Sequence, residues 1–236
     1  MKTTVRMIVL LIFVFLSVDS FAQSHSYQYE FARDYIKSLQ QLKKIADREI
    51  GQSAKKSKDE LALRMETTAN FRRAHADLLE AKDLMLKHKG SSQALVREIV
   101  KMVVRVYEQR IEINKSLQRY YDKLYSPEVV DNLGEYQKEY ATQMNRLTVE
   151  SDESFKLLMY CSSLVAYSLV SKTPDKDGNL SNLVITAKER KDLINELNSA
   201  FKKEARKGLR VGQNYLNICA AILYEILEGD YKPAKE

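Results

Sequence analysis

Apolar residues recur every three or four positions along most of the chain, which is the period of one face of an α-helix. No segment shows the strict alternation of apolar and polar residues that is typical of a β-strand. The pattern therefore predicts an all-α protein. We expect five helical stretches, at about residues 27–50, 59–88, 93–125, 126–170 and 186–226.

Two of these stretches carry apolar positions at heptad-like spacing. In the second stretch Phe71, Leu78 and Met85 lie seven residues apart, with Ala74 and Ala81 between them. The third has a stripe that keeps a spacing near 3.5 residues over four heptads: Ile99, Val103, Val106, Arg110, Ile113, Leu117, Tyr120 and Leu124. Such seams predict long helices that pack at shallow angles, as in coiled coils.

Arg110 places a charge within that apolar stripe. One interpretation is that its long side chain reaches past the apolar face to a carboxylate or a helix end. The alternative interpretation is a buried charge with a function of its own.

The fourth and fifth stretches have recognisable starts. Ser126-Pro127 combines a capping residue with proline at a first helical position, and Thr186 with Glu189 forms a capping box. Over Thr148–Ser154 the fourth stretch turns polar, which allows a break or kink there. Beyond it, Phe155–Val170 is the most apolar part of the chain after the N-terminus, and we expect it to be a central buried helix.

The N-terminal residues 1–22 have the organisation of a secretory signal peptide. Lys2 and Arg6 precede the apolar run Met7–Leu16, and Ser20-Phe21-Ala22 supplies the small residues of a cleavage site. An apolar run of about ten residues is too short to span a hydrocarbon core of ~30 Å. We therefore expect cleavage near Ala22 and a periplasmic or secreted protein without a transmembrane segment.

Length and composition favour one elongated bundle. Only seven Gly, three Pro and no Trp occur in 236 residues, so few residues break helices. After the signal peptide we expect residues 23–125 to form N-terminal helical hairpins, and residues 126–236 to complete the same bundle. Its seams could close within one chain or between two copies, so a homo-oligomer is an open alternative.

Cys161 and Cys219 are the two cysteines, and each falls on an apolar helical stripe. An oxidising compartment permits a disulfide between them. A free cysteine on such a stripe can equally act as a small apolar side chain. Both alternatives stay open, and a catalytic thiol is disfavoured because no histidine lies near either cysteine in sequence.

Fourteen tyrosines are unusual for a chain of this length, and several flank one predicted turn. Tyrosine has a large apolar body with a polar tip, which suits both an interface and the boundary of a helical bundle. We take as candidate partner contacts Tyr120, Tyr121, Tyr136 and Tyr140.

The sequence offers no motif for catalysis or for a cofactor. His25, His75 and His88 lack a partner at helical metal-ligand spacing, and we expect them to be exposed. The turn Asp175–Asn179 lacks the glycine and the glutamate that a calcium loop requires at its sixth and twelfth positions. We expect neither an enzyme nor a metal or cofactor site.

The net charge of +6 is mild, and the basic run Lys202–Arg210 fits a solvated helix face or a docking face for an acidic partner. Direct binding of nucleic acid is not expected.

Two segments resemble a known family. They are Leu117–Leu124, LQRYYDKL, and Ile185–Ile194, ITAKERKDLI. Both are similar to segments of the exported helical transfer proteins of conjugative transposons, which are related in type to the minor pilin of type IV secretion systems. The resemblance implies a periplasmic, non-catalytic component of a DNA-transfer apparatus, whose partners are other envelope or transfer proteins.

Two functions from different classes follow as hypotheses. The first is an exported assembly protein, most concretely a subunit of a conjugative transfer apparatus that acts through helix–helix contacts. The alternative is a free-standing periplasmic binding or chaperone-like module, which predicts a concave apolar pocket between helices. A hydrolase would instead require a perturbed carboxylate pair in a cleft.

Overall fold

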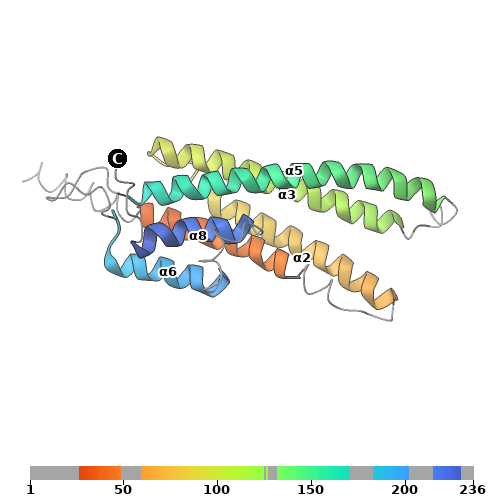
Figure 1. Ribbon diagram of the computed structural model, residues 1–236, viewed down its shortest axis with the longest axis horizontal. Helices are drawn as coiled ribbons and strands as arrows, with labels where there is room; N and C mark the ends of the chain where they lie inside the picture. The colour runs from red at the N-terminus through yellow and green to blue at the C-terminus, as the bar shows by residue number, and fades with distance from the viewer. Residues whose placement is uncertain are drawn as a thin grey trace, which may run out of the picture.

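A computed structural model describes residues 27–48, 60–124, 126, 132–170, 183–201 and 215–229. These residues form six helices and no strand, so the all-α prediction is confirmed (Figure 1). The first helix covers residues 27–48. The others are α2 (Glu60–Leu86), α3 (Ala94–Leu124), α5 (Leu133–Ser168), α6 (Ala187–Phe201) and α8 (Tyr215–Glu228). The expected signal peptide, the turn Asp175–Asn179 and the basic run Lys202–Arg210 lie outside the described residues.

The first helix is the central element of the bundle. Six of its side chains are fully buried: Phe31, Ala32, Tyr35, Ile36, Ser38 and Leu39. Because these residues are spaced by one, three or four positions, they form one continuous face of the helix. Hydrogen bonds from this helix reach α2, α3, α5 and α6.

The longer helices lie side by side along one axis (Figure 1). In chain order, α2 packs on α3, α3 packs on α5, and α8 packs on both α5 and α6. The heptad seam predicted in the second stretch faces this core, because Leu78, Ala81 and Met85 are all buried. The buried face of α3 consists of Val96, Ile99, Val100, Val103, Val106, Tyr107, Ile111 and Asn114.

Helix α5 runs without interruption for 36 residues. The break that the polar stretch Thr148–Ser154 allowed is absent from this helix. The hydroxyls in this stretch bond to their own helix: Thr148 donates to the Met144 carbonyl at 2.8 Å, and Ser154 donates to the Glu150 carbonyl at 2.9 Å. A polar turn can therefore continue the helix when its side chains have partners.

The end of α5 is not buried all round, which corrects the expectation for Phe155–Val170. Tyr160 and Tyr167 are 56% and 55% exposed, so this segment has a solvent-facing side. The central buried position belongs to the first helix instead. Among the described residues, no helix is both long and apolar enough to cross a membrane.

The expected fifth helix is divided into α6 and α8. Arg190 donates to the Leu227 carbonyl, and the Tyr224 hydroxyl donates to Asn198 at 3.0 Å. A continuous helix would hold positions 190 and 227 about 55 Å apart, at 1.5 Å per residue. α6 and α8 are therefore separate helices that pack as antiparallel neighbours.

The start of α6 confirms the predicted capping box. The Glu189 backbone N–H donates to the Thr186 hydroxyl at 3.2 Å, and the Thr186 backbone N–H donates to the Glu189 carboxylate at 2.8 Å. These two bonds satisfy backbone donors that the first turn of a helix otherwise leaves without partners.

Candidate functional site

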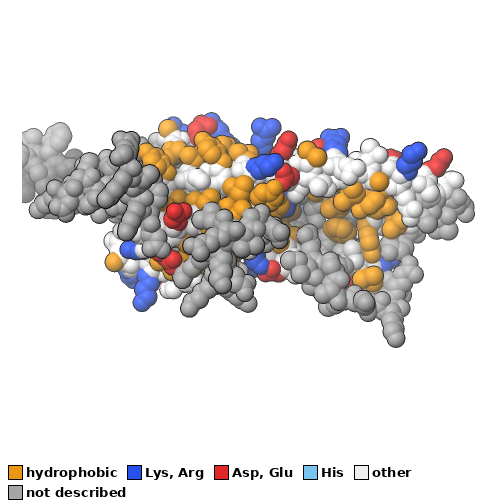
Figure 2. Space-filling model, viewed as in Figure 1, with side chains coloured by type: hydrophobic (Ala, Val, Ile, Leu, Met, Phe, Trp, Pro, Cys, Tyr) orange, Lys and Arg blue, Asp and Glu red, His pale blue; other side chains and the backbone are white. Residues whose placement is uncertain are grey.

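An apolar cleft of about 430 Å³ opens where the first helix ends and α8 begins. Beyond this point, of the described helices only α2, α3 and α5 continue (Figure 1). Figure 2 shows hydrophobic side chains gathered there between α5 and α2. The apolar lining consists of Leu42, Ile45, Ala46, Ala74, Leu78, Ile113, Leu117, Met144, Leu147, Phe155 and Leu216.

The lining follows from the same periodicity that builds the core. On α5 the cleft residues Met144, Leu147, Ser151 and Phe155 are spaced by three or four positions and so lie on one face. The first helix contributes the end of its apolar stripe. The described parts of the first helix and of α8 end beside this part of α3, and the side chains at their ends line the cleft.

Arg110 lies at the polar end of the cleft, and its guanidinium carbon is 4.0 Å from the centre of the Phe155 ring. One of its nitrogens donates to the Ser151 hydroxyl. The Phe155 ring also stacks with the ring of Tyr215, at 5.5 Å between centroids and 14° between planes. The Arg110 charge is therefore held on a fixed aromatic platform.

Asp152 anchors this platform from outside the cleft. Its carboxylate accepts a hydrogen bond from the Tyr215 hydroxyl and pairs with Lys156 at 2.6 Å. The hydrogen bond from Lys156, followed by that from Tyr215, lowers the pKa of the Asp152 carboxyl. Asp152 is thus ionised at neutral pH and keeps the Tyr215 ring in place.

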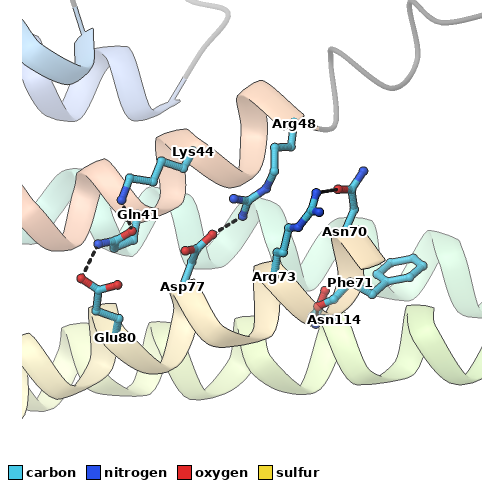
Figure 3. A network of polar contacts seen from close by, with 9 residues as sticks. All are labelled: Gln41, Lys44, Arg48, Asn70, Phe71, Arg73, Asp77, Glu80 and Asn114. Carbon is cyan, nitrogen blue, oxygen red and sulfur yellow. Dashed lines mark hydrogen bonds and ion pairs between the residues drawn. The ribbon is translucent and has the colours of Figure 1, made fainter. Parts of the chain in front are cut away.

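A network of polar contacts holds together the helices on the opposite side of the cleft (Figure 3). Gln41 of the first helix donates to Glu80 of α2 at 2.7 Å, and Arg48 pairs with Asp77. Asn114, which lines the cleft from α3, donates to the Phe71 carbonyl of α2 at 3.1 Å. These bonds fix the spacing of the first helix, α2 and α3.

Three of the four candidate tyrosines lie together beyond the far end of the cleft. The Tyr120 ring of α3 stacks on Tyr140 and Tyr136 of α5, at 3.4 Å and 4.9 Å between ring centroids. The Tyr136 hydroxyl donates to the Tyr120 carbonyl at 3.0 Å. Tyr121 packs against Phe71 of α2 at 5.9 Å. All four are half-buried and join helices of this chain; their role as partner contacts stays a prediction.

Cys161 and Cys219 are both buried as free thiols in the core. Burial raises the pKa of each thiol to about 12. The neighbouring Tyr35 hydroxyl is also fully buried, and desolvation raises its pKa well above the usual value. Unreactive neutral thiols are the expected consequence, and the disulfide that the sequence leaves open is a question for chemical measurement.

His88 contradicts the expectation that the histidines are exposed, because it is only 5% exposed. Its Nε2 lies 3.0 Å from an Asp34 carboxylate oxygen, and its Nδ1 lies 3.3 Å from the Tyr27 hydroxyl. Both partners come from the first helix, more than fifty residues away, so no local pattern indicated them. Across the described ranges, no three His, Cys, Asp or Glu side chains could together hold a metal ion.

Comparison of the chain with known protein families, with curated proteins and with solved structures finds no match. The function is therefore inferred from the geometry of the cleft. Arg110 was singled out by its sequence pattern, whereas Phe155 and Tyr215 were not singled out as its neighbours. Those residues lie 45 and 105 positions after Arg110, and no spacing rule connects them to it.

Proposed function

We propose that the protein is a helical binding module that takes up an apolar group of another molecule in the cleft. The cleft itself is the observation that carries this proposal. Its volume of about 430 Å³ lies within the range of about 300–1,000 Å³ that is common for ligand sites. A mainly apolar lining with a few polar groups at one end is also typical of such sites.

The polar groups of the cleft favour binding over catalysis. A serine nucleophile needs a neighbouring base, but the Ser151 hydroxyl accepts a hydrogen bond from Arg110, which stays protonated in proteins. Asn114 donates to a backbone carbonyl and has no titratable group. We therefore assign these side chains to holding the cleft and its ligand.

Export provides the setting for this proposal. The signal peptide expected in residues 1–22 would place the module in the periplasm or outside the cell. Intact mass of the protein from an envelope fraction tests this setting. We expect a chain that begins near Gln23, whereas a full-length chain among cytosolic proteins would contradict it.

Thermal unfolding with decan-1-ol as an apolar probe tests the binding role. A ligand at ten times its Kd stabilises the folded state by about 1.4 kcal/mol. We expect the probe to raise the Tm of the wild type but not that of Met144→Trp, which fills the cleft. Val149→Trp is the matched control, because Val149 is 59% exposed on the same helix and does not line the cleft. No stabilisation of the wild type would contradict the proposal.

A second candidate function is assembly within a conjugative DNA-transfer apparatus. Its support is the resemblance at Leu117–Leu124 and the half-buried tyrosine cluster Tyr120, Tyr136 and Tyr140 at the same end of the bundle. Pull-down from envelope extracts should then recover other transfer proteins, and Tyr121→Ala should weaken the recovery. Recovery of none would contradict this function. Sedimentation of the purified protein would show whether two copies associate.

A further inference from the structure

We propose that the ligand of the cleft is a small amphiphile with one anionic head group, which pairs with Arg110. This inference rests on the proposed binding function and adds the chemical class of the ligand. Of the described residues that line the cleft, Arg110 alone carries a charge. A single cation at the end of an apolar cleft selects an anion, because ionic attraction is stronger beside apolar walls than in water.

The position of the Arg110 side chain suits it to carboxylate recognition. Guanidinium presents five N–H donors in a rigid plane, and it binds a carboxylate through two parallel hydrogen bonds. Contact with Phe155 and the bond to Ser151 restrict that plane. Less conformational entropy is then lost when an anion binds. The anion would join the partners that Arg110 already has.

The carboxylate of Asp152 is close to Arg110 in the fold, but it does not neutralise the Arg110 charge within the cleft. Asp152 lies on α5 next to Ser151, but it is not among the residues that line the cleft. Its carboxylate is occupied by Lys156 and by the Tyr215 hydroxyl. Among the described residues that line the cleft, Arg110 therefore supplies the charge at its polar end.

The apolar part of the cleft sets the size of the ligand. Along α5 the lining extends from Phe155 to Met144, about 16 Å at 1.5 Å per residue. The cleft volume of about 430 Å³ lies in the lower part of the range of about 300–1,000 Å³ found for small-molecule sites. A carboxylate with about ten carbons matches this space. A whole helix, with a diameter of about 10–12 Å, would fit only by inserting a few side chains.

Isothermal titration calorimetry with three ten-carbon probes tests the inference. The probes are decanoate, decan-1-ol and decyltrimethylammonium, each kept below its micelle-forming concentration. We expect one decanoate per chain, bound at least tenfold more tightly than decan-1-ol, and the cation bound most weakly. Equal affinity for all three would overturn the anion preference but leave the binding function standing. Binding of none would instead contradict the binding function itself.

Variants of Arg110 connect the preference to this residue. Arg110→Gln should bring decanoate and decan-1-ol to equal affinity, whereas Arg110→Lys should keep a reduced preference for decanoate. Arg105→Gln is the matched control, since Arg105 is exposed on the same helix and does not line the cleft. Circular dichroism shows whether each variant folds. If Arg110→Gln does not fold, the comparison of Arg110→Lys with the wild type decides. A full preference for decanoate in either Arg110 variant would overturn the assignment.

Discussion

The hydroxyl of Tyr35 lies 2.7 Å from Oγ of Ser162, in a fully buried part of the core. The same hydroxyl donates to the Leu158 carbonyl at 3.0 Å, so it joins the first helix to α5. One turn further along the same side of the first helix, the Tyr107 hydroxyl of α3 donates to Ser38 at 2.7 Å. Three helices are therefore connected by hydrogen bonds between buried side chains, which favours one register of packing over others.

Replacement of Tyr35 by phenylalanine should destabilise the bundle by about 1–2 kcal/mol. The substitution removes a buried hydrogen bond and leaves the Leu158 carbonyl with one partner fewer. Urea unfolding measures the loss. Tyr160→Phe is the control: that side chain is 56% exposed, so its change should stay within about 0.5 kcal/mol. Equal effects of the two substitutions would contradict the role of the Tyr35 hydroxyl.

The two thiols should react slowly in the folded protein. With a pKa of about 12, the thiolate fraction of Cys161 or Cys219 at pH 8 is about a thousandfold below that of a thiol with the ordinary pKa of 9.0. We expect alkylation by iodoacetamide to be slow until urea unfolds the chain. Rapid alkylation of the native protein would show that the thiols are accessible.

The same chemistry decides whether the cysteines form a disulfide after export. Mass is measured after alkylation in urea, with and without reductant. Addition of label at both Cys161 and Cys219 without reductant would exclude the bridge. Labelling that requires reductant would establish the bridge as the oxidised form of this buried pair.

Under reducing conditions, stability should fall in alkaline solution. Folding raises the pKa of both thiols from 9.0 to about 12, so the unfolded chain loses these protons at lower pH than the folded chain. The stabilisation is complete below about pH 9 and is lost as pH rises towards 12. We expect a decrease on the order of 1–3 kcal/mol at pH 10 in urea unfolding. The double variant Cys161→Ala/Cys219→Ala should show a shallower decrease, and an identical profile would refute the assignment.

Loss of the capping box should loosen α6 selectively. Thr186→Ala removes the acceptor for the Glu189 backbone N–H and should cost about 1 kcal/mol. Hydrogen exchange should accelerate in the first turn of α6 more than in α3. Lys188→Ala serves as the control, because Lys188 is exposed and lies two residues after Thr186 in the same turn. No change in exchange at α6 would mean that packing on α8 alone holds this helix.

Features that depend on local spacing could be predicted from the sequence. The buried face of α2, with Leu78 and Met85, and the Thr186–Glu189 cap each lie within one helix, so their signals are continuous in the chain. Arg110 was also visible as a charge in an apolar stripe. Its neighbours were not, because Phe155 and Tyr215 reach it only through the packing of α3, α5 and α8.

The wrong predictions concern long-range contacts. His88 is buried because Asp34 and Tyr27 of the first helix provide its partners. The polar turn in α5 stays helical, and its Ser154 gains a further partner in Gln109 of α3 at 2.6 Å. The apolar residues of α6 and α8 have the same spacing as those of one long helix. Their spacing therefore does not indicate that the two helices are antiparallel. Each of these outcomes is decided by residues that are distant in sequence.

Methionine methyl groups offer the most direct test that the cleft is the binding site. The described residues include five methionines, and only Met144 lines the cleft; the others are Met65, Met85, Met102 and Met159. In a titration of [methyl-¹³C]methionine-labelled protein with decan-1-ol, followed by NMR, we predict a saturable shift of the Met144 methyl signal and little change in the other four. An unmoved Met144 signal, or equal shifts of all five, would contradict a binding site in this cleft.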